Sequence, residues 1–166
     1  METTQIITMH ERIENLLKSP VFISIICSWL AAQFIKTIVK LCKKEIHSVS
    51  EFFESMFWST GGMPSSHTAV VVSVCTTIGF RSGIDSDVFI LSFCLMLITV
   101  RDALGVRRAT GLQAMKINEI GRYLSGKDDI EISSVKEIQG HKPMEVIGGA
   151  ALGLLIGVLF SLFLKA

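Results

Sequence analysis

The chain has 166 residues, of which 49% are hydrophobic and only 19% are charged, and its formal net charge is +1. This composition is too apolar for an ordinary soluble domain of this size. We therefore expect one compact membrane domain.

Residues 1–19 form the first predicted element, an interfacial helix with apolar side chains on one face. Residues 20–166 are predicted to be a single membrane domain. Its candidate spans approach the length of about 20 apolar residues that a helix needs to cross a bilayer. They are residues 21–41, 64–80, 88–104 and 144–164. A soluble bundle with very apolar core helices is the alternative, and the long, uncharged last run argues against it. The predicted fold class is thus all-α, an integral membrane helical bundle.

Two short polar islands, Gly61–His67 and Gly140–Glu145, stand where long apolar runs begin. Each places one histidine, His67 or His141, beside a proline. The first turn of a helix favours proline, and its free backbone N–H groups, together with the positive end of the helix dipole, favour bound anions. The two islands predict a phosphate site.

Charged residues follow the third candidate span at Asp102, Arg107 and Arg108. An aspartate near the end of an apolar run is costly unless it pairs, and arginine offers phosphate a fork of fixed donors. We expect Arg107 or Arg108 to contact an anionic substrate and Asp102 to orient a basic group. The polar stretch Asn118–Lys142 is predicted to be a surface loop.

Cleavage of a phosphate ester without a metal needs a nucleophile, a proton donor for the leaving oxygen, and positive donors around the equatorial oxygens. Two imidazoles can fill the first two roles, and arginine, lysine and helix N-termini can supply the donors. The four cysteines have no paired metal-ligand spacing, and neither a metal nor another cofactor is expected.

Three segments in order resemble the divergent branch of the type 2 phosphatidic acid phosphatase (PAP2) superfamily, whose members share a helical core with vanadium haloperoxidases. The segments are Gly61–Ala69, Asp102–Ala114 and Gly140–Val146. The resemblance implies a PAP2-like helical core. It also implies dephosphorylation of a lipid phosphate or diphosphate of the phosphatidate, phosphatidylglycerol phosphate or prenyl type.

The resemblance also implies roles for the matched residues. His141 would attack phosphorus as the nucleophile, with Glu145 as its acidic partner, and His67 would protonate the leaving alkoxide. The residues that carry over as phosphate ligands are Lys36, Lys43, Ser65 and Ser66.

Three departures from the superfamily pattern affect the phosphate ligands. Ser66 replaces the glycine of the second motif. Lys43 and Lys44 stand where the first motif has an arginine and a proline, and Val135 occupies the arginine position of the third motif. Arg107 or Arg108 could supply the missing guanidinium from another segment.

Basic residues concentrate after the first candidate span and between the third and fourth. The positive-inside rule then places this side, with the active site, on the cytoplasmic face of the cytoplasmic membrane. The expected partners are the bilayer and a lipid phosphate, and nucleic acid is not expected. The small residues of Gly148–Gly153 permit close helix packing, within one chain or in a homo-oligomer. A non-catalytic protein that binds anionic head groups or a partner, and a lipid phosphotransferase, are the alternative functions.

Overall fold

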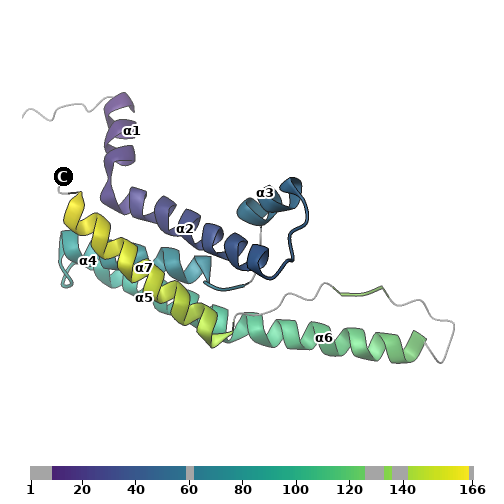
Figure 1. The fold of residues 1–166 in the computed structure, drawn as a ribbon. Helices are drawn as coiled ribbons and strands as arrows, with labels where there is room; N and C mark the ends of the chain where they lie inside the picture. Colours follow the sequence, from purple (N-terminus) through teal and green to yellow (C-terminus); the bar gives the residue numbers. More distant parts are fainter. Residues whose placement is uncertain (1–8, 59–61, 126–132, 136–141, 165–166) are drawn as a thin grey trace, which may run out of the picture.

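The computed structural model describes residues 9–58, 62–125, 133–135 and 142–164. In these ranges the chain forms seven helices and no strand (Figure 1). The helices are α1 (Met9–Lys18), α2 (Pro20–Cys42), α3 (Val49–Trp58), α4 (Ser66–Ser82), α5 (Asp87–Leu104), α6 (Val106–Ser125) and α7 (Pro143–Phe163). The predicted all-α fold class is confirmed.

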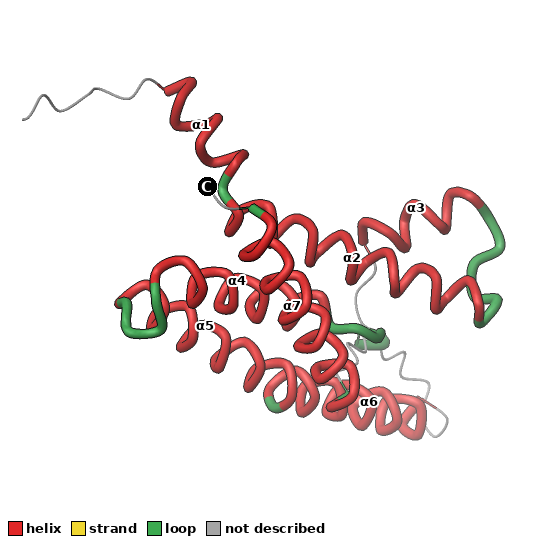
Figure 2. The backbone as a smooth tube through the Cα atoms, turned by 60° about the vertical axis from the view of Figure 1, so that its left-hand side comes forward, coloured by secondary structure: helices red, strands yellow, loops and turns green. Residues whose placement is uncertain are grey.

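Three helical stretches are long and apolar enough to cross a bilayer: Pro20–Cys42, Pro143–Phe163 and the continuous Asp87–Ser125, which contains α5 and α6. Helix α4 has 17 residues and includes several serines and threonines. It lies at the centre of the bundle, where it packs against α7, α2 and α5 (Figures 1 and 2). Its crossing of the membrane stays a prediction.

Prolines and a serine set the starts of the central helices. Pro20 and Pro143 stand in the first turns of α2 and α7, where the missing N–H removes no helical hydrogen bond. Ser65 caps α4, because its hydroxyl accepts a hydrogen bond from the backbone N–H of Thr68. Pro64 lies before this cap and outside the first turn, so only the second polar island has its proline inside a helix.

Helices α4 and α7 touch along a row of glycines. A Cβ on Gly149 would overlap the backbone oxygen of Ser65, and one on Gly153 would overlap that of Ala69. Four residues further along α7, from Gly149 to Gly153, the contact has also moved four residues along α4, from Ser65 to Ala69. The two helices are therefore parallel and begin at the same end of the bundle. The close packing available to Gly149 and Gly153 is therefore used within one chain.

Helix α2 runs antiparallel to α4 and is bonded to it at both ends. The hydroxyls of Ser73 and Thr77 each donate to Ser24, to its carbonyl oxygen and its hydroxyl respectively, at 3.2 Å. Such hydrogen bonds between helices are typical of membrane bundles. At the other end Lys36 contacts Ser66.

Helix α5 follows α4 after a short turn and is also antiparallel to it. One end of the bundle therefore gathers the N-termini of α4 and α7 and the last turns of α2 and α5 (Figure 1). We call this end the mouth.

Helix α6 continues from α5 beyond the mouth and corrects the predicted loop, which is helical from Asn118 to Ser125 (Figure 1). Lys116 forms an ion pair with Glu119 one turn further on, and Gly121 lies inside the helix and does not end it. Helix α3, which was not predicted, folds back against α2 (Figure 2).

Candidate functional site

The mouth contains a buried lysine. Lys36 lies near the end of α2, only 3% of it is exposed, and its Nζ donates a hydrogen bond to Ser66 Oγ at 3.1 Å. Ser66 is the first residue of α4 and is buried as well. The predicted phosphate ligands Lys36 and Ser66, thirty residues apart in the chain, are thus in contact.

Ser65 joins the two polar islands. Its backbone N–H donates to the carbonyl oxygen of Glu145 at 2.8 Å, which fixes the start of α4 against the first turn of α7. Its fully buried hydroxyl accepts hydrogen bonds from the N–H and the hydroxyl of Thr68. In this structure the Ser65 hydroxyl acts as a helix cap, while its backbone holds the mouth together.

Glu145 is half-buried in the first turn of α7. Its carboxylate accepts a hydrogen bond from the backbone N–H of Lys142 at 3.3 Å and lies within electrostatic range of Lys36. An acid in this position also suits the positive end of the helix dipole. His141, its predicted catalytic partner, lies outside the described residues.

His67, the predicted proton donor, is the second residue of α4 and is exposed. The first-turn N–H groups of an α-helix have no acceptor within their own helix. The exposed imidazole therefore stands at a helix end suited to anions.

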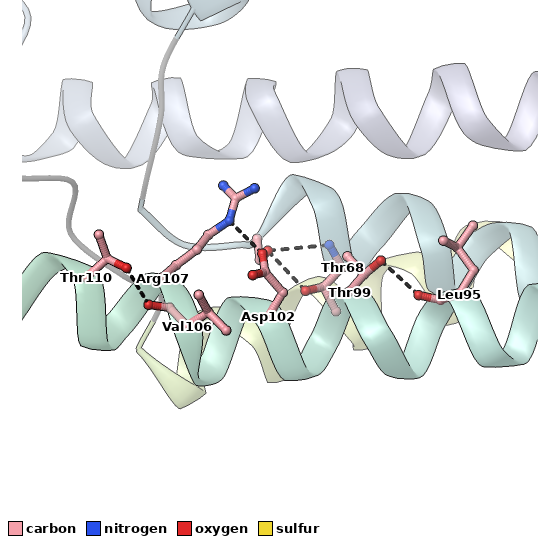
Figure 3. A network of polar contacts seen from close by, with 8 residues as sticks. Thr68, Leu95, Thr99, Asp102, Val106, Arg107 and Thr110 are labelled. Atoms are coloured by element: carbon pink, nitrogen blue, oxygen red, sulfur yellow. Dashed lines mark hydrogen bonds and ion pairs between the residues drawn. The ribbon is translucent and has the colours of Figure 1, made fainter.

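Asp102 and Arg107 form an ion pair at the junction of α5 and α6. Arg107 Nε lies 2.8 Å from Asp102 Oδ2, and the two side chains are 49% and 41% exposed. Figure 3 shows this pair in the same view as Thr68 of α4, whose first turn packs alongside the end of α5. The sequence predicts a basic partner for Asp102 without identifying it, and the structure shows Arg107 in this place.

Two predicted phosphate ligands have no described contact with this cluster. Lys43 is exposed at the end of α2, seven residues beyond Lys36, or about 10 Å along a helix axis. Arg108 is exposed on the first turn of α6.

One buried polar group at the mouth was missed from the sequence. Gln33 is 4% exposed, and its Oε1 has no hydrogen-bond partner among the described residues. The available signal was a carboxamide inside an apolar run, one turn before Lys36. Within the same ranges, no group of three or more His, Cys, Asp and Glu side chains is arranged to hold a metal.

The family model described as the divergent PAP2 family matches residues 17–156. The chain belongs to the divergent PAP2 family. It is 37% identical over 120 residues to the uncharacterized membrane protein YuiD of Bacillus subtilis (strain 168), an alignment that covers 66% of this chain and 76% of the relative. No solved structure matches. With its three candidate spans, this divergent PAP2 chain is an integral membrane protein.

Val135, which the sequence comparison above predicts at the position of the third-motif arginine, lies against α6. The backbone N–H and carbonyl of Val135 bond to the side-chain amide of Asn118, each at 2.8 Å. This two-way contact ties the divergent segment to α6.

Proposed function

We propose that this divergent PAP2 protein is a metal-independent phosphatase that hydrolyses a lipid phosphate or diphosphate through a phosphohistidine intermediate. The observation that carries the proposal is the 2.8 Å hydrogen bond from Ser65 N–H to the Glu145 carbonyl oxygen. It joins the second and third motifs at the point where the buried Lys36 ammonium contacts Ser66. Two helix N-termini and one ammonium group are suited to bind a phosphate.

The reaction follows from the roles that the family pattern assigns. His141 attacks phosphorus, the bond from phosphorus to the leaving oxygen breaks, and His67 protonates that oxygen, which is an alkoxide for a phosphate ester and a phosphate oxygen for a diphosphate. Water then attacks the phosphohistidine, gives a proton to His67 and releases inorganic phosphate. Lys36 and the first-turn N–H groups stabilise the charge on the equatorial oxygens.

The membrane explains why such a site lies at the end of a bundle. A lipid phosphate keeps its charged group at the mouth while its tail stays among the apolar faces of α2, α5 and α7. The positive-inside bias supports a mouth that opens to the cytoplasm, in the cytoplasmic membrane.

A non-catalytic lipid-binding function is favoured by one observation. The Ser65 hydroxyl and the Glu145 carboxylate both complete helix ends. Those contacts stabilise the fold whether or not a reaction takes place.

The test is phosphate release by the purified protein, in the presence of a chelator, from phosphatidate, phosphatidylglycerol phosphate and a prenyl diphosphate. We expect release by the wild type, none by His141→Ala or His67→Ala, and a loss of about 10²–10³-fold in kcat for Lys36→Met. Vanadate should inhibit the wild type. If no lipid yields phosphate while both histidine variants bind lipid normally, the binding function is correct, and a phosphorylated acceptor without free phosphate would identify a phosphotransferase.

A further inference from the structure

A buried carboxamide with an unpaired oxygen lies on the Lys36 face of α2. Gln33 is more than nine-tenths buried, and its Oε1 lacks a partner within the described ranges. A buried acceptor without a donor is unfavourable, most of all between membrane helices, where no bulk water can replace the donor. The oxygen therefore requires a partner from outside the described chain.

The position of Gln33 indicates which part of a bound lipid it meets. It precedes Lys36 by three residues, so the two side chains share a helix face, and Gln33 lies about 4.5 Å further from the mouth. The hydroxyl of Thr37 bonds to the backbone oxygen of Gln33 at 3.0 Å, which leaves the side-chain carboxamide unaffected. If Lys36 holds the phosphate, Gln33 faces the atoms that follow it toward the bilayer, which are those of the leaving group.

The chemistry of an amide oxygen selects among the possible leaving groups. A phosphate dianion, an acyl ester and a prenyl chain offer no hydrogen-bond donor, whereas a free hydroxyl does. Phosphatidylglycerol phosphate carries such a hydroxyl on the glycerol that bears its terminal phosphate. Phosphatidate, whose glycerol is fully esterified, has none.

We propose that Gln33 accepts a hydrogen bond from a hydroxyl on the leaving group, and that the protein thereby prefers lipid phosphates with a hydroxylated head group. Gln33 is then a specificity-determining residue of the mouth. The choice of Gln33 rests on its burial and its position on α2. The identity of the ligand rests on the proposed phosphatase function.

The experiment compares phosphatidylglycerol phosphate with an analogue in which the free hydroxyl of the terminal glycerol is replaced by hydrogen. For the wild type we expect kcat/KM to be about tenfold higher with the hydroxylated lipid, because the analogue leaves a buried acceptor unpaired. Gln33→Met, which keeps the volume and removes the polar atoms, should bring this ratio close to one, mainly through a loss on the hydroxylated lipid.

Ser55 of α3 offers a matched control. Its Oγ is also buried without a hydrogen-bond partner in the described chain, but it lies on another helix. Ser55→Ala should keep the substrate ratio of the wild type. A wild-type ratio near one, or a Gln33→Met variant that lowers both activities equally, would overturn the assignment.

A second measurement separates this inference from the proposed function. The rise in unfolding temperature on adding each lipid is recorded for the wild type and Gln33→Met, since this readout needs no turnover. A larger rise with the hydroxylated lipid that disappears in Gln33→Met would support the recognition even in a protein that releases no phosphate. Equal rises with both lipids in the wild type would contradict it even in an active enzyme.

Discussion

Arg107 and Arg108 are neighbours in the chain, but only one of them is held in place by a described contact. The bond from Arg107 Nε to Asp102 fixes its guanidinium at the end of α5, next to the start of α4. Arg108 lies about 100° further around the helix and is exposed. The sequence does not decide whether Arg107 or Arg108 replaces the guanidinium missing at Val135. We propose that Arg107 does.

Arg107→Gln should therefore raise the KM for a lipid phosphate about tenfold, the effect of losing one charge-assisted hydrogen bond. Arg108→Gln is the matched control and should change KM less than about twofold, as expected for an exposed charge. Because the Asp102–Arg107 pair is half-exposed, neither variant should lower the free energy of unfolding by more than about 1 kcal/mol. Equal changes in KM would exclude the distinction between the two arginines.

The residues at the mouth were predictable to different degrees. The motif resemblance led to Lys36, Ser65, Ser66 and Glu145, and the structure brings these four together. Gln33 could not be recognised in the same way, because its Oε1 is unpaired only if no neighbouring residue donates a hydrogen bond to it. That property depends on the packed bundle, and the sequence shows only a carboxamide inside an apolar run.

At the scale of helices, the apolar runs gave the best predictions. Helices α2, α4, α5 and α7 begin and end within two residues of the predicted segments, because prolines, capping serines and Gly83 stand at their ends. Helix α6 was partly mistaken for a loop, because the prediction rested on Gly121, Gly126 and the mixed charges that follow Gly126, and only Gly121 of these lies in the helix. The other residues of α6 include many strong helix formers, so the single glycines Gly111 and Gly121 do not end it.

The contact between α4 and α7 predicts a difference between two glycines of the same helix. Alanine at Gly153 would meet the backbone oxygen of Ala69, whereas alanine at Gly148 would meet the flexible end of Met63 at 3.1 Å. Gly153→Ala should lower the free energy of unfolding by about 1–3 kcal/mol, the usual cost of overpacking. Gly148→Ala gains the same helix propensity and should cost less than about 1 kcal/mol.

Unfolding of the two glycine variants in mixed micelles measures this difference directly. Retained phosphate binding by Gly148→Ala would show that the substitution leaves the mouth intact. If Gly153→Ala were as stable as the wild type, the helices could not be as close as the structure has them.

At the scale of the whole molecule, the orientation in the membrane is open to a test with native cysteines. Cys42 is exposed at the end of α2, on the same side as the mouth, whereas Cys94 is exposed near the middle of α5. In variants that keep a single cysteine, an impermeant maleimide should label Cys42 in inside-out vesicles and leave it unlabelled in intact cells. Cys94, surrounded by lipid, should react in neither preparation, and labelling of Cys42 from outside would reverse the proposed orientation.

The parallel arrangement of α4 and α7 has a consequence for how the mouth responds to its surroundings. Each helix start carries about half an elementary charge from its aligned peptide groups, so two starts together approach one full positive charge. No proton can titrate this charge, although the Glu145 carboxylate in the first turn of α7 offsets part of it. The attraction of the mouth for anions therefore belongs in part to the backbone itself, and this part persists in acid, in alkali and in any point mutant that keeps the two helices side by side.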